Sequence, residues 1–293
     1  LLQEHARIEG DRLIAEHPPE SGYIRRMGLD FHSSDTLLGA GMRMGPAQIA
    51  LARAGGLAEV VVHEAPRITV IEGGDELCAD PADCPPGHTP AVNGTMLCAM
   101  AAEAGAAAMQ IGPVADDVAQ LTHAIERASA DASLVIMTGG ASVGPHDLVK
   151  PALEAAGFAL DFWRVAIKPG KPLLVATRGD AVVLGLPGNP VSSFVPAFLF
   201  MLPAIRRLAG ARDCLPRGVP MALGAPLPAG GKRREFLRAS WSGDAVIAAD
   251  VQDSSALLPL AHAQVLIDWP AGADAAETGA FVPCYLLESG GYA

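Results

Sequence analysis

Between residues 67 and 210, short apolar runs alternate with longer segments whose apolar residues recur at helical spacing. The runs predict strands over residues 68–71, 107–114, 134–137 and 181–186, and the longer segments predict helices over residues 95–104, 118–130, 148–156 and 190–208. Strands that alternate with helices favour a largely parallel sheet covered on both faces. We therefore predict a central three-layer α/β domain with a mostly parallel sheet.

The pattern changes on either side of this stretch. After residue 210, short β-like segments at residues 236–241, 245–251, 263–269 and 281–287 are separated by turns and predict a small β domain. Before residue 67 there is a polar beginning and one short helix over residues 46–54, where Pro46 suits a first helical turn. The predicted division is an N-terminal remnant with a linker (1–66), the α/β domain (67–210) and a C-terminal β domain (211–293).

Composition and charge narrow the classes of function. The chain has 293 residues, half of them hydrophobic and 18% charged, which is typical of a folded globular protein with more than one core. Its formal net charge of −11 disfavours broad binding to nucleic acid or to an anionic membrane. The apolar run at residues 191–205 is shorter than the roughly 20 residues of a membrane span and contains Pro196 and Pro203, so we predict a buried, kinked helix.

The five cysteines are odd in number and form no CxxC pair. We therefore predict neither a disulfide framework nor a zinc site, and a reducing cytoplasm fits this cysteine usage best. Two of the cysteines, Cys78 and Cys84, fall in a segment at residues 78–91 that is rich in Pro, Gly and Asp. Such a segment is long for a connection in a compact α/β unit, so it is either functional or mobile.

The predicted strand at residues 134–137 runs directly into TGGASVG, residues 138–144, and a helix follows. Glycines in such a loop let backbone N–H groups approach an anion, and the helix N-terminus adds a favourable dipole. The motif is neither a P-loop nor a dinucleotide fingerprint, and a structural turn explains it equally well. The candidate ligand-binding residues here are Thr138, Gly139, Gly140, Ser142 and Gly144.

Two further motifs place rigid backbone beside cations. In KPGKP, residues 168–172, Lys168 and Lys171 precede prolines, and Arg164 lies four residues before Lys168. The chain has only four lysines, so this clustering points to an anion, although a rigid surface turn is the plainer alternative. In GLPGNP, residues 185–190, we expect Asn189 to cap a helix with Pro190 in its first turn, while Pro187 and Gly188 stiffen the loop.

Acidic residues follow the predicted strands. They are Asp75 and Glu76 after the first strand, Asp116 and Asp117 after the second, and Asp147 after the third. In a parallel sheet these positions share one edge with the Gly-rich loop and the lysines, and ligands bind beyond that edge. Carboxylates beside phosphate-binding groups suit Mg²⁺, although each acid by itself also fits a helix cap.

Together these motifs resemble the MoeA and gephyrin E-domain family. The matching stretches occur in order along nearly the whole chain and are IRRMGLDF, PRITVIEGGDEL, NGTML, the Asp116-Asp117 pair, TGGASVGPHDLVKP, FWRVAIKPGKP, GLPGNPVSSF, REFLR and VQDSSALLPLA. The resemblance implies a molybdopterin molybdotransferase of the cytoplasm. Such an enzyme inserts molybdate into adenylylated molybdopterin with the help of Mg²⁺, and acts as a homodimer.

The resemblance also implies roles for particular residues. Acids of the metal and molybdate site would be Glu76, Asp116 and Asp147, and these residues with Lys168 would be catalytic. Cations for phosphate or oxyanion groups would be Arg164, Lys168 and Lys171. Pro187 and Pro190 would shape the pocket wall beside Gly188 and Asn189, and Arg25 and Asp30 would belong to the family's linker motif. Charge neutralisation and positioning are what the loss of an adenylyl group requires.

The chain departs from the family in two places and in extent. Glu72-Gly73 stands where the family usually has Ser-Thr or Thr-Gly, and Ala91-Val92 stands where it usually has Asp-Ser, so we expect altered local charge and metal affinity. The chain begins at Leu1, and we expect it to be part of a longer protein, without the family's N-terminal region. Two alternatives stay open, namely an adenylyltransferase acting on molybdopterin and a non-catalytic molybdopterin-binding module.

Overall fold

The computed structural model describes residues 3–15, 17, 25–139 and 148–287. The chain forms two compact units, Leu1–Val61 and Val62–Ala293. Within the first unit, β1 (Ala6–Glu9) and β2 (Arg12–Ala15) form an antiparallel hairpin that the sequence did not predict. Helix α1 (Pro46–Ala54) has the predicted bounds, with Pro46 in its first turn.

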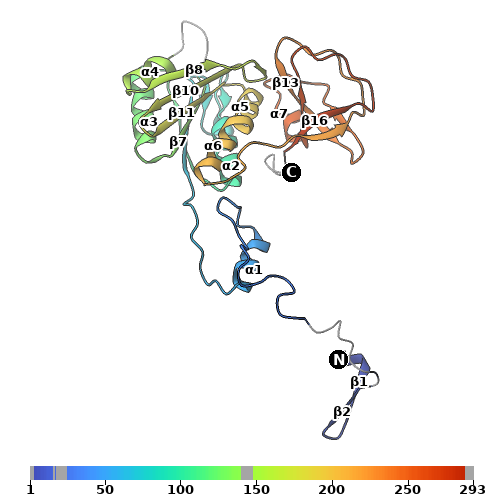
Figure 1. Ribbon diagram of the computed structural model, residues 1–293. Coiled ribbons are helices and arrows are strands. Elements are labelled where there is room, and N and C mark those ends of the chain that lie inside the picture. Colours follow the sequence, from blue (N-terminus) through green and yellow to red (C-terminus); the bar gives the residue numbers. More distant parts are fainter. Residues whose placement is uncertain (1–2, 16, 18–24, 140–147, 288–293) are drawn as a thin grey trace. The chain divides into compact units, whose positions relative to one another are not determined.

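The second unit is built on a six-stranded sheet of order β6-β3-β7-β11-β10-β8 (Figure 1). Its strands are β3 (Arg67–Gly73), β6 (Ala107–Val114), β7 (Leu134–Thr138), β8 (Ala159–Arg164), β10 (Pro172–Arg178) and β11 (Ala181–Leu186). The pairs β6 with β3, β3 with β7 and β7 with β11 are parallel, whereas β10 pairs antiparallel with both β11 and β8. The prediction of a mostly parallel sheet is confirmed.

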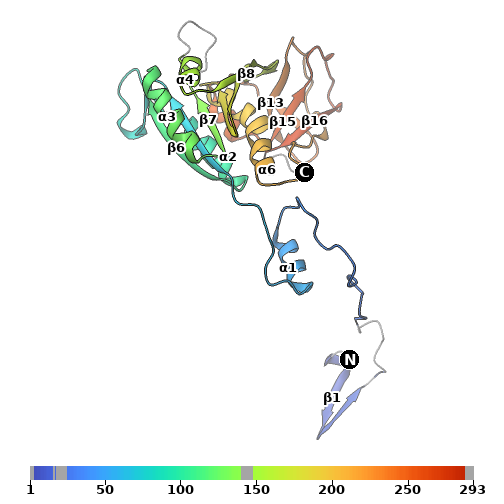
Figure 2. The ribbon, with the colours of Figure 1, turned by 60° about the vertical axis from the view of Figure 1, so that its left-hand side comes forward.

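Helices cover both faces of this sheet, so the three-layer prediction is also confirmed. Helices α3 (Val118–Asp131) and α4 (Val149–Ala155) lie on one face, and α2 (Asn93–Glu103), α5 (Pro190–Pro196) and α6 (Leu202–Leu208) lie on the other (Figures 1 and 2). A separate apolar core fills each side. One is centred on Leu121, Ile125 and Leu153, and the other on Leu97, Val195 and Phe198. We refer to this part of the unit as the α/β domain.

The long apolar helix predicted at residues 190–208 is interrupted, as its prolines led us to expect. Between α5 and α6 lies the π-helical segment η4 (Ala197–Met201), which begins directly after Pro196. By length and hydropathy Pro190–Leu208 could cross a membrane, but 67% of its most apolar window is buried inside the protein. This segment is therefore the core helix that the sequence predicted.

The C-terminal β domain follows. Its strands are β12 (Val219–Ala222), β13 (Arg234–Trp241), β14 (Val246–Ala248), β15 (Val265–Trp269) and β16 (Phe281–Leu286), in the order β12-β16-β15-β13-β14, and its short helix is α7 (Leu257–Ala261). Strand β9 (Ile167–Lys168), which follows β8, pairs in parallel with the start of β13. The β domain is thus joined to the α/β domain by strand pairing as well as by the chain.

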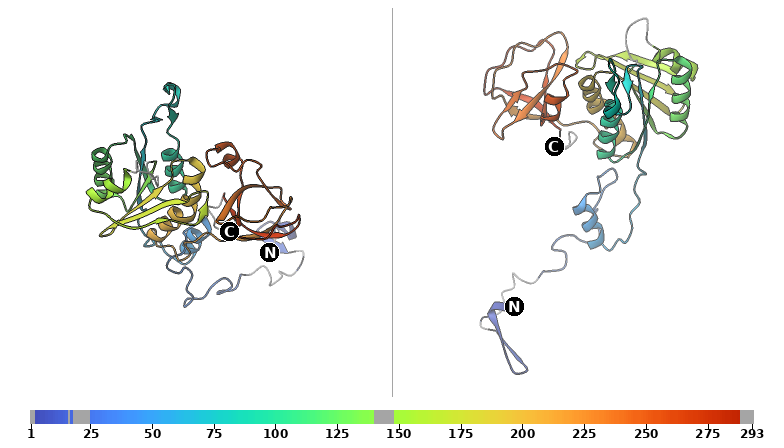
Figure 3. Two further views of the ribbon diagram at one scale, coloured as in Figure 1. Left: turned by 90° about the horizontal axis from the view of Figure 1, so that it is seen from above. Right: turned by 180° about the vertical axis from the view of Figure 1, so that it is seen from behind.

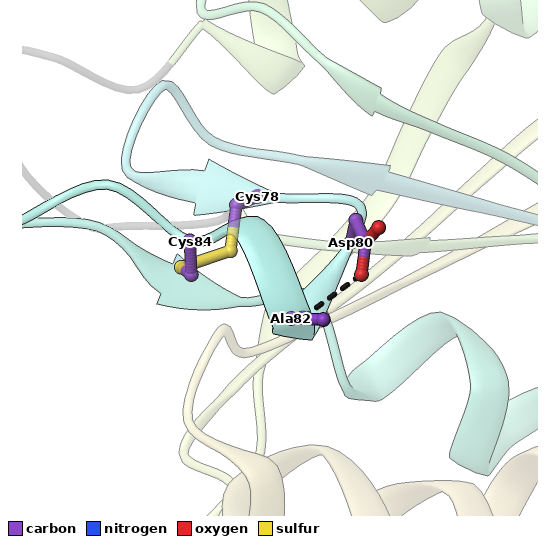
Figure 4. The surroundings of a disulfide bond; sticks show 4 residues. All are labelled: Cys78, Asp80, Ala82 and Cys84. Carbon is purple, nitrogen blue, oxygen red and sulfur yellow. Dashed lines mark hydrogen bonds between the residues drawn. A yellow bond between two sulfur atoms is a disulfide. The ribbon is translucent and has the colours of Figure 1, made fainter.

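Several elements and one cysteine pairing differ from the expectations. Strands β8, β10 and β12 and helix α7 are among the elements that were not predicted. Cys78 and Cys84 form a disulfide with a Cα–Cα separation of 5.6 Å (Figure 4). The 3-10 helix η3 (Pro81–Asp83) turns the chain between them, and Asp80 accepts a hydrogen bond from the N–H of Ala82 at 2.8 Å. The expectation of no disulfide was wrong because we looked for CxxC spacing, whereas this pair meets only through that turn. The segment projects from the α/β domain (Figure 3, left).

Candidate functional site

The carboxyl ends of β3, β7 and β11 meet at one edge of the sheet. In the strand register Glu72 lies opposite Thr138, and Thr138 lies opposite Leu186. Because the three strands are parallel, the loops that follow them, including TGG and GLPGNP, leave the sheet side by side. This edge is where the sequence placed the site.

A buried chain of polar groups links these strand ends. The side-chain amide of Asn93, the first residue of α2, donates to Thr138 Oγ1 at 3.1 Å and to the carbonyl of Gly188 at 2.6 Å. Thr138 Oγ1 lies 3.1 Å from the Pro187 carbonyl, to which it donates, and 3.3 Å from Ser193 Oγ. Asn93, Thr138 and Ser193 are all buried, so these bonds form away from water and hold the loops in one arrangement.

The backbone at Gly139 approaches that of Gly73 so closely that only glycine fits there. Gly139 has φ +82°, and a Cβ there would collide with the carbonyl oxygen of Gly73. A Cβ at Gly188 would lie 3.6 Å from the Cα of Gly139, in ordinary contact. Gly139 is therefore required for packing between β3 and the TGG loop. Of the predicted ligand-binding residues of this loop, Gly140, Ser142 and Gly144 lie outside the described residues, as does Asp147.

The predicted cations lie at the same edge. Arg164 ends β8 and pairs with Pro172 at the start of β10, while Lys168 and Lys171 lie in the connection between these strands. Strand β10 runs antiparallel to β11, so its start lies beside the end of β11 and the GLPGNP loop. Arg164, Lys168 and Lys171 are exposed and can therefore be reached from solvent. A Cβ at Gly170, φ +102°, would collide with Pro196 of α5, which shows how closely KPGKP approaches that helix.

The C-terminal β domain contributes two side chains to this region. Lys168 Nζ donates to Glu235 Oε2 of β13 at 2.9 Å, so the predicted anion-binding lysine is already part of an ion pair. Asn189 does not cap α5, as we had expected. Its amide instead donates to Ser254 Oγ at 2.9 Å, and the Ser254 carbonyl accepts from the N–H of Val191 at 3.0 Å. Pro190 does occupy the first turn of α5.

Ser254 belongs to a loop that a buried arginine holds. Arg238, which is 1% exposed, donates to the Gln252 side chain at 3.2 Å and to the carbonyls of Asp253 and Ala256 at 2.9 and 3.1 Å. Burial lowers the pKa of Arg238, while the nearby Asp253 acts in the opposite direction. Arg238 therefore holds in place the β-domain loop that contacts α5.

The predicted acids divide between capping and exposed positions. Asp117 caps α3 by accepting from the N–H of Gln120 at 2.9 Å, and Asp75 accepts from the N–H of Asp116 at 3.0 Å. Glu76 and Asp116 are exposed at the carboxyl ends of β3 and β6. Within the described ranges, no group of three or more His, Cys, Asp or Glu side chains could hold a metal ion. The third predicted acid of the metal site, Asp147, lies outside the described residues.

Glu72 differs most from what we expected. It is 1% exposed and accepts hydrogen bonds from the N–H groups of Asn93 and Gly94 at 3.0 and 2.8 Å and from the Gln110 side chain at 3.1 Å. Burial raises its pKa above the ordinary 4.5, and the two backbone N–H groups act in the opposite direction. Its charge in turn contributes, after burial, to a raised pKa of the Cys98 thiol.

Sequence reasoning missed Asn93, Ser193, Glu235 and Ser254 as members of this region, although all four fall within the quoted motifs. A usable signal did exist for Glu72 and Asn93. Both are polar residues next to apolar segments, one at the end of β3 and the other opening a helix without a capping residue before it. Such residues are buried only when they are hydrogen-bonded to each other or to the backbone.

Comparison with known proteins identifies both domains. Residues 69–207 match the family described as "Probable molybdopterin binding domain", and residues 220–287 match the family described as "MoeA C-terminal region (domain IV)". The crystal structure of the molybdopterin biosynthesis MoeA protein from Pyrococcus horikosii superposes with a TM-score of 0.78 at 26% identity, covering 97% of this chain and 70% of that one.

The family matches therefore define a protein with a molybdopterin-binding domain. Molybdopterin molybdenumtransferase 2 of Mycobacterium tuberculosis is 35% identical over 264 residues, which make up 88% of this chain and 65% of that protein. The Nostoc molybdopterin molybdenumtransferase is 33% identical over 242 residues, covering 81% of this chain and 56% of that protein. The chain belongs to the MoeA family, and it spans about two thirds of the length of the first of these relatives.

Proposed function

We propose that the chain carries the molybdopterin-binding part of a molybdopterin molybdotransferase, which inserts molybdate into adenylylated molybdopterin and releases the adenylyl group. The observation that carries the proposal is the meeting of both domains at one sheet edge. Lys168 of the α/β domain pairs with Glu235 of the β domain, and Asn189 pairs with Ser254. The names of the two transferase relatives support the same reaction.

The residues of this edge have separable tasks in the proposal. Arg164, Lys168 and Lys171 neutralise the phosphate and oxyanion charge of the substrates, which is the main requirement for breaking a phosphoanhydride. The Pro187–Pro190 segment, held by Asn93 from one side and Ser254 from the other, forms the wall against which the pterin lies.

Substitution of Lys168 tests this proposal, and Lys150 provides the control. Both side chains are 49% exposed and both form an ion pair with a glutamate, Lys168 with Glu235 at 2.9 Å and Lys150 with Glu154 on α4 at 3.9 Å. Loss of a charge-assisted contact to the ligand should weaken binding by about tenfold to a hundredfold. We expect Lys168→Ala to lose that much affinity for adenylylated molybdopterin and to slow molybdate-dependent AMP release, while Lys150→Ala stays near wild type. Equal behaviour of the two variants would contradict the proposed site.

The same assay separates the alternatives. Formation of adenylylated molybdopterin from ATP would favour an adenylyltransferase, and molybdopterin binding without molybdate-dependent AMP release would favour a non-catalytic binding module. The two links to the β domain favour molybdate insertion over adenylyl transfer, because an activity confined to the α/β domain has no need of them.

The resemblance further supports Mg²⁺ assistance, a homodimer and a cytoplasmic location, which we include in the proposal. Mg²⁺ dependence is checked by AMP release with and without EDTA, using Asp116→Asn as the variant expected to need more Mg²⁺. The dimer is checked by light scattering of the purified chain. In a reducing cytoplasm Cys78 and Cys84 would be thiols, which quantitative labelling of cysteines in cell extracts would reveal.

A further inference from the structure

Glu72 is buried beside Thr138, opposite it in the strand register. It is a buried carboxylate at the end of β3, and its two oxygens accept three hydrogen bonds, from Asn93 N, Gly94 N and Gln110 Nε2. Within the part of the chain that the structure describes, N–H groups rather than a lysine or arginine balance its charge. Two of these groups are the first N–H groups of helix α2, an end that attracts negative charge.

The local sequence is fitted to this arrangement. Val92, the residue in front of α2, has no side-chain oxygen, so the helix makes no side-chain cap of its own. Gly94 leaves the space that the carboxylate fills, because a Cβ at that position would lie 2.6 Å from Glu72 Oε2. An apolar residue before the helix, a glycine in its second position and a glutamate from the neighbouring strand thus replace an ordinary helix cap.

Asn93 links Glu72 to two loops outside helix α2. The backbone N–H of Asn93 is held by Glu72, while its side-chain amide reaches Thr138 Oγ1 and the Gly188 carbonyl at 3.1 and 2.6 Å. The amide oxygen of Asn93 is buried and has no hydrogen-bond partner among the described residues. A small shift in the first turn of α2 would therefore break contacts to two loops of the proposed ligand site.

We propose that Glu72 is a positioning residue for the ligand site: it fixes the first turn of α2, and through Asn93 it fixes Thr138 and the backbone at Gly188. The carboxylate does not touch the ligand. Because Glu72 already accepts hydrogen bonds from the N–H groups of Asn93 and Gly94, the N-terminus of α2 cannot bind an anion. The negative charge of the ligand is bound instead by the cations on the other side of GLPGNP. The ligand's identity rests on the proposed function, whereas the coupling from Glu72 to Gly188 does not.

Hydrogen exchange of the ligand-free protein tests the coupling. In Glu72→Ala we expect faster exchange both in the first turn of α2 and in residues 187–194, with the remainder of the α/β domain unchanged. The control is Asp117→Ala, which removes the cap of α3 on the other face and should affect α3 alone. If Glu72→Ala does not fold, Glu72→Gln provides the test, because its amide keeps one acceptor and should give a smaller change at the same two places. Faster exchange confined to α2 would overturn the proposal.

Ligand affinity provides the second test. We expect Glu72→Ala to bind molybdopterin about tenfold more weakly, a loss typical of residues that orient binding groups from behind. Adding Val92→Ser to Glu72→Ala places a hydroxyl acceptor in front of α2 without restoring the bond to Asn93 N, so stability to urea should recover in part while affinity should not. Recovery of affinity would show that Glu72 is only a cap. If wild type binds no molybdopterin, the proposed function fails, and the exchange experiment still decides the coupling.

Discussion

Substitution of Gly94 by alanine brings two effects of opposite sign into competition. Gly94 is the second residue of α2. Alanine is favoured over glycine inside a helix by about 1 kcal/mol, so helix propensity alone predicts a more stable protein. The contacts of Gly94 with the Glu72 carboxylate predict the reverse.

The magnitude follows from what the added methyl group would meet. A Cβ at residue 94 would lie 2.6 Å from Glu72 Oε2 and closer still to the Gln110 amide. Glu72 is 1% exposed and has no room to leave, whereas Gln110 is half-buried and can rotate away, which breaks its 3.1 Å bond to Glu72. Losing a hydrogen bond to a charged group costs about 1.5–3 kcal/mol and overpacking about 1–3 kcal/mol. After the gain in propensity, we expect Gly94→Ala to lower the free energy of unfolding by about 2–4 kcal/mol.

Urea unfolding followed by circular dichroism measures this loss, and a second background isolates its cause. In Gln110→Ala the crowding amide is gone, so Gly94→Ala should cost at least about 1 kcal/mol less there than in wild type. The reasoning is refuted if Gly94→Ala stabilises the protein, or if its cost is the same in both backgrounds.

Two further predictions concern the buried charges. Because the pKa of Glu72 is raised, the folded protein binds this proton more tightly than the unfolded chain, so the stability contribution of Glu72 falls as pH rises from its ordinary 4.5 through the folded value. Urea titrations at several pH values should therefore show wild type losing stability relative to Glu72→Gln from pH 4 to pH 7, and a gain would contradict the burial argument. Arg238→Met keeps the apolar stem but removes the donors to Gln252, Asp253 and Ala256. It should cost about 2–4 kcal/mol and speed hydrogen exchange at residues 251–256, and unchanged exchange there would show that Arg238 does not hold the loop.

The strands that could be predicted are those buried on both faces. Strands β3, β7 and β11 show runs of apolar residues because helices cover them from two sides. Strand β8 was missed because it lies at the edge of the sheet, where Asp161 and Phe162 are exposed and no apolar run is needed. Strand β10 is apolar but begins at Pro172, the last residue of KPGKP, so its first residue belongs to a motif that indicates a turn. Edge position and neighbouring motifs, rather than weak propensity, account for both omissions.

The site was predictable where it depends on topology and unpredictable where it depends on side-chain contacts. A parallel sheet gathers the ends of its strands at one edge, so the meeting of Thr138 and Pro187 followed from the predicted strands, whereas the place of the KPGKP cations depends on β8 and β10, which were not predicted. The pairing of Lys168 with Glu235 did not follow either, because it requires β9 to add to a strand of another domain. The burial of Glu72 likewise depends on the space left by Gly94, which lies 22 residues further along the chain.

Neighbouring residues of GLPGNP are held from opposite directions. The Gly188 carbonyl is bound by Asn93 of the α/β domain, and the Asn189 side chain is bound by Ser254 of the β domain. Losing either anchor leaves the loop held from one side, so its position depends on both domains at once. Ser254 is fixed by Arg238, and Asn93 is fixed by Glu72, two buried charged groups that lie behind the site rather than in it. A loop that is fixed from two sides has less conformational freedom to lose when a ligand binds. The β domain therefore favours ligand binding at the α/β domain by holding GLPGNP in place.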